Sequence, residues 1–187
     1  MEAWILPIII IAVILIIGFY IGGKYNSFVT MRNKTEEAFS TMDVYLKKRY
    51  DLIPNFVETV KGYAKHESET LEKVIAARNM AMNSSSVDQQ IENENILQGT
   101  LKSLFALTES YPDLKANANF IQLQNQLETL ENDIANARKY YNAVVNSFNV
   151  EIEKFPANII AGMFKFTRKP LYEVSDTTQR ENVKVQF

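Results

Sequence analysis

The N-terminal apolar run constrains this chain more than any other feature. It extends from Trp4 to Ile21, and the first Lys or Arg comes only at Lys24. Roughly 18 helical residues at 1.5 Å each cover about 27 Å, close to the hydrocarbon thickness of a bilayer. A helix that is apolar all the way round is difficult to cover in a soluble fold. We therefore predict a transmembrane anchor over residues 1–23, with the lipid bilayer as its partner.

A cleaved signal peptide is the alternative to this anchor. Signal peptides have a basic start, a shorter apolar stretch and an A-x-A-like cleavage site, whereas this chain begins with the acid Glu2 and has no such site after the run. An uncleaved anchor is therefore favoured. Because Lys24, Arg32 and Lys34 follow the run, the positive-inside rule predicts an N-terminus outside and a cytoplasmic domain.

Long helices are predicted after the anchor, since Gly and Pro are rare there. A first apolar stripe covers residues 25–64 and keeps its phase through Pro54, which favours one kinked helix over two helices broken at residues 51–55. Gly22-Gly23 leaves open whether this helix continues the anchor. A second stripe covers residues 68–108 and is interrupted by a loop at residues 83–86.

The third stripe, residues 120–155, is a coiled-coil-grade seam that ends at Pro156. We therefore expect an all-α fold: the transmembrane helix, then an antiparallel bundle of three long rods, one of them interrupted, and a short C-terminal apolar helix. The predicted domains are the anchor (1–23), the bundle (24–166) and a polar C-terminal tail (167–187), extended or disordered.

In this topology the first rod leaves the membrane, the second returns and the third leaves again. The turn at residues 111–113 then lies near the membrane, and the apolar segment 155–164 lies at the far end. We expect that segment to cap the bundle against Tyr63 and Ala64; an apolar peg for a membrane or another subunit is the alternative.

The same topology predicts two ion pairs that fix the register of the rods, Arg138–Asp43 and Arg78–Asp51. Third-rod positions then face first-rod positions about 93 residues earlier, which places Arg138 level with about position 45, within a turn of Asp43. Arg78 on the second rod faces about position 55 of the first, within reach of Asp51. Charges that simply point to solvent are the alternative.

Sequence motifs for chemistry are few. His66 is the single histidine and Cys is absent, so a zinc site, a Ser-His-Asp triad or a di-iron bundle lacks its residues. Phosphate-binding Gly motifs are also missing. We expect His66 to be a solvated turn residue and Glu36 and Glu37 to be surface charges. A net charge of −2, with interspersed signs, argues against nucleic-acid binding. No enzyme activity, cofactor, metal or small-molecule substrate is predicted.

Six motifs resemble the signature of the LemA family: Tyr25-Asn26, residues 45–67 (YLKKRYDLIPNFVETVKGYAKHE), Ala77-Arg78-Asn79, residues 111–117 (YPDLKAN), residues 137–142 (ARKYYN) and Phe155-Pro156-Ala157-Asn158. The resemblance runs from Tyr25 to about Phe166, with Phe39 where the family often has Trp. It implies a bacterial inner-membrane protein with one N-terminal span and a cytoplasmic helical bundle. It supplies no catalytic residues, and its magnetosome-associated branch hints at membrane organisation by analogy.

Two functions follow from these features. The first is a non-enzymatic membrane-anchored scaffold that self-associates and organises membrane or envelope proteins. The second is an accessory or adaptor subunit of a membrane protease or transporter complex. Candidate contact residues are the apolar and aromatic side chains left over after one seam is filled, together with the apolar segment: Phe56, Tyr63, Phe105, Tyr140, Ile159, Ile160, Met163 and Phe164.

Overall fold

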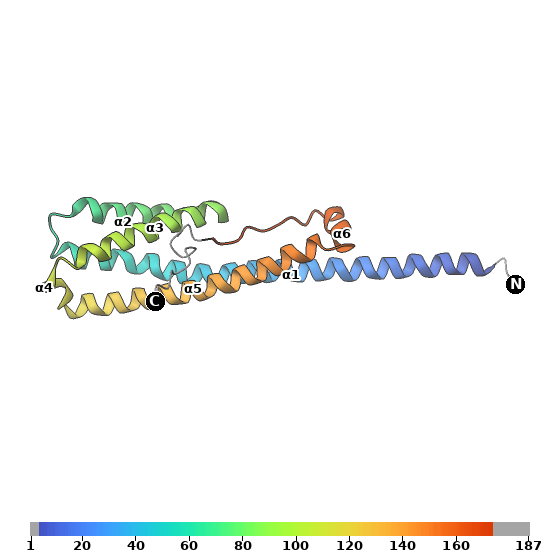
Figure 1. The fold of residues 1–187 in the computed structure, drawn as a ribbon, viewed down its shortest axis with the longest axis horizontal. Coiled ribbons are helices and arrows are strands. Elements are labelled where there is room, and N and C mark those ends of the chain that lie inside the picture. Colours follow the sequence, from blue (N-terminus) through green and yellow to red (C-terminus); the bar gives the residue numbers. More distant parts are fainter. Residues whose placement is uncertain (1–3, 174–187) are drawn as a thin grey trace, which may run out of the picture. The chain divides into compact units, whose positions relative to one another are not determined.

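The computed structural model describes residues 4–173. Every regular element in this range is a helix, and the all-α class is confirmed. The helices are α1 (Ile5–Lys61), α2 (Ser68–Met82), α3 (Val87–Thr108), α4 (Pro112–Lys115), α5 (Ala118–Glu153) and α6 (Ala157–Met163) (Figure 1).

Helix α1 runs without interruption from the apolar run into the domain. Gly22 and Gly23 lie inside it, so the apolar run and the first predicted rod form one helix. Pro54 also lies inside it, as the unbroken phase of the stripe predicted.

The described residues form two compact units, and both α1 and α5 contribute to each. Unit 1 comprises Met1–Thr41 and Arg138–Leu171, and unit 2 comprises Met42–Ala137 and Tyr172–Phe187, in both cases as far as residues are described. The predicted domain boundaries at residues 23 and 166 follow composition and stay predictions.

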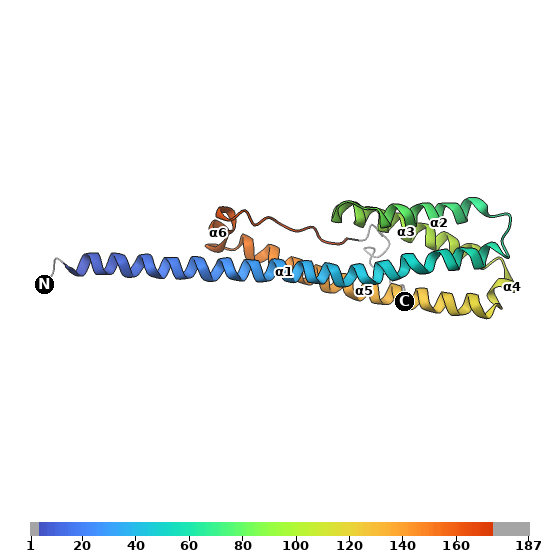
Figure 2. The same ribbon diagram turned by 180° about the vertical axis from the view of Figure 1, so that it is seen from behind.

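Unit 2 contains a helical hairpin that corrects the predicted path. Helices α2 and α3 pack side by side (Figures 1 and 2), and Asn93 of α3 donates to the carbonyl oxygen of Met80 in α2 at 3.1 Å. The chain therefore reverses at residues 83–86. The expectation that residues 68–108 form one interrupted rod is wrong, because the Asn-Ser loop is a turn between antiparallel helices.

The reversal changes the direction of α5, which runs antiparallel to α1 within each unit. In unit 1, Lys24 pairs with Glu151, and in unit 2, Arg49 pairs with Glu131. The predicted parallel register is therefore wrong. The turn before α5 lies beside the end of α1, where Asn117 donates to the hydroxyl of Tyr63 at 2.8 Å, and not near the apolar run as expected.

Aromatic and aliphatic side chains fill the core of unit 2. The Phe56 ring lies 5.4 Å from Phe105 and 5.2 Å from Phe120 between ring centroids, joining α1, α3 and α5. The other fully buried apolar residues with no exposed surface in this unit are Met42, Leu46, Ile53, Val60, Val74, Leu97, Leu104 and Leu114.

Unit 1 has its own small core where α6 packs. Phe28 of α1, Phe148 and Ile152 of α5, and Ala157, Ile160 and Ala161 of α6 form one cluster. The predicted cap against Tyr63 and Ala64 is therefore wrong, because antiparallel α5 brings α6 to Phe28 of α1.

The first part of the predicted tail is extended and held against α5. The Asn149 amide donates to the carbonyl oxygen of Lys169 and accepts from its N–H, both at 2.9 Å, and the Tyr141 hydroxyl donates to the carbonyl of Pro170. Residues 174–187 of the predicted tail lie outside the described residues.

Candidate functional site: a buried ion network in unit 2

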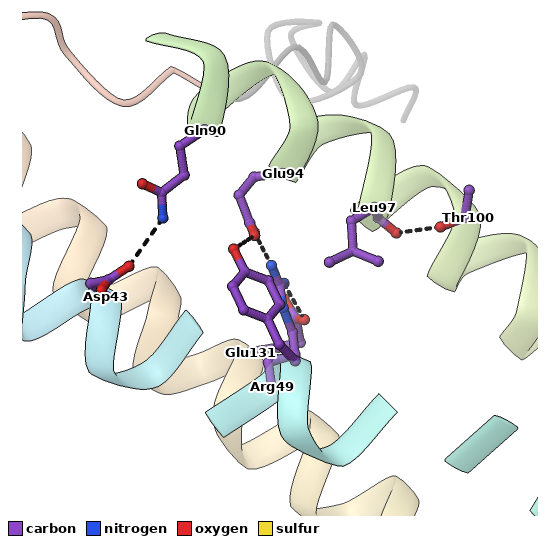
Figure 3. Close-up of polar contacts among 8 residues, drawn as sticks. Asp43, Arg49, Gln90, Glu94, Leu97, Thr100 and Glu131 are labelled. Atoms are coloured by element: carbon purple, nitrogen blue, oxygen red, sulfur yellow. Dashed lines mark hydrogen bonds and ion pairs between the residues drawn. The ribbon is translucent and has the colours of Figure 1, made fainter. Parts of the chain in front are cut away.

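The most polar part of the interior of unit 2 surrounds Arg49. This guanidinium is only 2% exposed, and it donates through Nη2 to Glu94 Oε2 and through Nη1 to Glu131 Oε1 at 2.6 Å. Figure 3 shows α1, α3 and α5 each supplying one of these side chains. The network therefore ties three helices together at one level.

Both oxygens of the Glu94 carboxylate have a donor. Arg49 reaches one and the Tyr50 hydroxyl donates to the other. Burial raises the pKa of Tyr50 above its usual value near 10, so the phenol keeps the proton that it donates. The buried charges of Arg49 and Glu94 compensate each other, and the second carboxylate, Glu131, is 36% exposed.

The chemistry of this cluster favours a structural role. A guanidinium does not deprotonate in proteins and so transfers no proton, and Glu94 has its oxygens occupied by protein donors. Among the described residues, no group of three or more His, Cys, Asp or Glu could hold a metal ion. The arrangement can fix the register of α1, α3 and α5.

A second polar contact supports α1 at its internal proline. Pro54 has no N–H and cannot donate to the carbonyl of Tyr50, four residues earlier. Arg78 of α2 supplies the missing donor, because its Nε lies 3.0 Å from that carbonyl oxygen. The same side chain also donates to Asn79 Oδ1 at 3.0 Å.

The structure shows which groups surround the residues of the two predicted ion pairs. Arg78 reaches the residue that precedes Asp51, so α2 lies at the expected level of α1, while its ion pair with Asp51 stays a prediction. Asp43 accepts a hydrogen bond from Gln90 at 3.1 Å (Figure 3). Arg138 belongs to the other unit, and its pair with Asp43 stays a prediction.

Two of the predicted contact residues are buried. Phe56 has no exposed surface and Ile160 is 4% exposed, because they fill the cores of units 2 and 1. Neither side chain is available to a partner, so both are corrections to the predicted contact surface. Phe105 is half-buried against Phe56.

The remaining candidates are exposed: Tyr63, Tyr140, Ile159, Met163 and Phe164. His66, Glu36 and Glu37 are exposed as well. Glu36 lies 3.7 Å from Lys169.

Sequence reasoning missed Arg49 and Glu94, although a signal was present. Each occupies a stripe position: Arg49 lies between Leu46 and Ile53 at steps of three and four, and Glu94 lies three residues before Leu97. A charge at such a position faces the core and requires an opposite charge there.

Comparison with known proteins decides the family. The LemA family model matches residues 38–187, which include all of the network residues. The chain belongs to the LemA family. Among its relatives is a protein named LemA from Metamycoplasma hominis, 27% identical over 162 residues that cover 84% of this chain and 72% of the relative.

Other relatives of this LemA-family chain carry a different name. Magnetosome protein MamQ 2 of Paramagnetospirillum magneticum is 24% identical and covers 80% of this chain. Magnetosome protein MamQ of Magnetospirillum gryphiswaldense is 23% identical and covers 78%. The chain spans 65% and 63% of the lengths of these two relatives.

Proposed function

We propose that this LemA-family chain is a non-enzymatic, membrane-anchored helical scaffold that self-associates and organises membrane or envelope proteins. The continuity of α1 carries this proposal. One helix contains both the apolar run and Arg49, the central residue of the ion network. Holding the run in a bilayer therefore holds the bundle beside it.

The apolar part of α1 supports the anchor. It is long and apolar enough to cross a membrane by length and composition, and no residue of its most apolar window is buried. Trp4 and Tyr20 stand near its two ends, where amphipathic rings favour the membrane–water interfaces. The basic residues that follow the run favour a cytoplasmic domain and an external N-terminus.

The interior of the domain supports a scaffold over a catalyst. Its most buried charges, Arg49 and Glu94, are paired with each other, and Tyr50 completes the pairing. The exposed aromatic residues Tyr63 and Tyr140 offer contact area for a second copy. The names of the magnetosome relatives are in keeping with work at a membrane.

Two differently tagged full-length copies, expressed together and cross-linked in native membranes, test self-association. We expect mixed-tag dimers or larger species, and retention of each tag on the other in mild detergent. Protein that is strictly monomeric, both in membranes and at micromolar concentration in detergent, would refute self-association and with it the scaffold function. A stable complex with one other membrane protein and no mixed-tag species would favour the adaptor function instead.

Anchoring is tested separately. We expect the protein from cells to retain its N-terminal residues and to stay with the membrane fraction through washes in plain buffer. Protein that begins after Gly23 and washes free would overturn the anchor.

A further inference from the structure

Helix α6 lies beside the end of the apolar run. The cluster formed by Phe28, Phe148, Ile152 and α6 also contacts Ile21, the last residue of the run. From Ile21 to Phe28 a helix rises about 10 Å, and each headgroup layer of a bilayer is roughly 5–8 Å thick. If the run spans the hydrocarbon, α6 is level with the headgroups next to it.

The outward side of this region is apolar. Ala157, Ile160 and Ala161 point into the cluster and are nearly fully buried. The side chains that point outward are large and exposed: Phe155 at 81%, Ile159 at 56%, Met163 at 64% and Phe164 at 45%. Residues 159 and 163 are one helical turn apart and share a face. Such a contiguous apolar surface favours a binding partner.

Aromatic contacts connect this surface to α1. The Phe164 ring lies 4.7 Å from the ring of Tyr25 between centroids, and Phe166 lies 5.2 Å from Phe28. Tyr25 is itself 39% exposed and directly follows Lys24. The apolar surface is therefore continuous with the end of the run.

The charge of the surrounding segment is positive. Residues 151–169 contain four basic side chains, Lys154, Lys165, Arg168 and Lys169, against the two acids Glu151 and Glu153. Lys154 pairs with Glu151, Arg168 pairs with Glu153, and Lys169 lies 3.7 Å from Glu36. Basic side chains close to a membrane surface are attracted by anionic lipids. Apolar residues flanked by such bases are typical of segments that lie in the membrane interface.

We infer that the outward side of α6 and its flanking residues, formed by Ile159 and Met163 with Phe155 and Phe164, inserts into the headgroup layer of the bilayer that holds α1 and contacts anionic phospholipid there. This inference rests on the proposed anchor. It adds a second membrane contact, which sets the rotation of α1 about its axis by placing one side of unit 1 against lipid.

Single-cysteine spin labelling tests this contact, because the chain has no native cysteine to compete for the label. Full-length Ile159→Cys and Met163→Cys proteins are labelled with a nitroxide and reconstituted into vesicles of phosphatidylethanolamine and phosphatidylglycerol. Accessibility of each label to molecular oxygen and to a water-soluble nickel chelate is then measured. Both sites are exposed, so the label displaces no core side chain.

Two matched sites on α1 calibrate the measurement. Ile14→Cys lies in the apolar run and reports the anchor itself. Thr41 is exposed and belongs to the same unit. It lies about 30 Å along the helix from Ile21, so a label on Thr41→Cys gives the chelate accessibility of a site in water. We expect labels at 159 and 163 to favour oxygen over the chelate, with chelate accessibility several-fold below that at 41.

Four results would contradict the inference in whole or in part. Labels at 159 and 163 that match Thr41, while Ile14 reports hydrocarbon, would refute α6 insertion and leave the anchor intact. High chelate accessibility of a label at residue 14 would refute the anchor as well. Labels at 159 and 163 could instead have low accessibility to both oxygen and the chelate, with accessibility rising when labelled protein is diluted with unlabelled protein. That result would show that a second copy of the chain covers this face. Replacing phosphatidylglycerol by phosphatidylcholine should raise chelate accessibility at 159, and no change would refute the part played by anionic lipid.

Discussion

Arg78 Nε donates to the carbonyl oxygen of Tyr50 at 3.0 Å, the acceptor that Pro54 leaves without a helical partner. A proline inside a helix removes one backbone donor and leaves a carbonyl four residues earlier unpaired. Here α2 supplies a charged donor from outside the helix. This explains how α1 passes through a proline without ending, and it couples α1 to α2.

The coupling between Arg78 and Pro54 can be measured with a double-mutant cycle. Arg78→Met should destabilise the native protein by about 1.5–3 kcal/mol, because the hydrogen bond to a charged donor is lost. In a Pro54→Ala background the restored N–H competes for the carbonyl, so the same change should cost clearly less. Denaturant unfolding of the full-length protein in detergent gives each free energy. Lys73→Met, on the exposed side of α2, should change little, and equal costs in both backgrounds would contradict the coupling.

The buried pair of Arg49 and Glu94 should be sensitive to loss of one partner. Arg49→Met leaves a buried carboxylate unpaired, which costs about 3–5 kcal/mol. The double variant Arg49→Met/Glu94→Leu removes both charges and should recover much of that loss. Denaturant unfolding measures both. Lys61→Met breaks an exposed pair with Glu58 and serves as the control with little effect, and a double variant no better than Arg49→Met would argue against charge compensation.

Acid should weaken the contact between α1 and α5 in unit 1. The hydrogen bond from Lys24, 2.6 Å from Glu151, lowers the pKa of that carboxyl, and a second bond from Lys154 lowers it further. The bond with Glu151 likewise raises the pKa of Lys24. A depressed carboxyl pKa stabilises the fold above the unfolded value of about 4.3, and this is lost as pH falls through the folded pKa. A raised Lys pKa acts below about 10.4 and is lost as pH rises through its folded value.

Carbon-13 NMR titration of the Glu151 carboxyl in micelles checks this prediction. Its midpoint should lie below the usual glutamate range. Lys24→Met should move the midpoint upward more than Lys154→Met does, because the bond to Lys24 is the larger cause. An unchanged midpoint in the Lys24→Met protein would show that the pair does not form.

Alanine variants at Phe56 and Tyr140 should have different effects, one on folding stability and the other on self-association. Phe56→Ala empties a fully buried site and should cost about 3–5 kcal/mol of unfolding free energy. Tyr140 is 58% exposed, so Tyr140→Ala should leave stability nearly unchanged and reduce mixed-tag cross-linking. Denaturant unfolding and the co-expression assay report the two effects. A Tyr140→Ala protein that unfolds easily, with association intact, would reverse the assignment.

Lys165→Gly should stabilise the end of α6. Lys165 has a φ of 57°, and the Phe166 N–H bonds the Ala161 carbonyl while the Lys165 N–H bonds that of Gly162, as in a Schellman motif. Gly occupies the left-handed region without the cost of a Cβ, so we expect a gain of about 1 kcal/mol. Hydrogen exchange at the Phe166 amide should slow. Lys165→Ala keeps the Cβ and serves as the control without gain, and faster exchange in the Gly variant would contradict the motif.

The residue pattern alone determined the long helices, the short helix α6 and several of their ends, but not α4, which was expected to be a turn. Helical periodicity is local, and Pro, Gly and Asn-Ser clusters act on the residues next to them, so the passage of α1 through Pro54 and the end of α5 before Pro156 were predictable. The family followed from motifs that lie on these helices and on the turns between them.

Tertiary structure decided the path and therefore the neighbours. An Asn-Ser interruption permits either a continued or a reversed rod, and only packing distinguishes them. Reversal lets Asn93 satisfy its amide on Met80 and Ser84, and it places Glu94 beside Arg49. That one reversal also turns α5 round and brings α6 to Phe28. The choice depends on burying apolar faces and pairing charges that lie far apart in the chain, which no local pattern records.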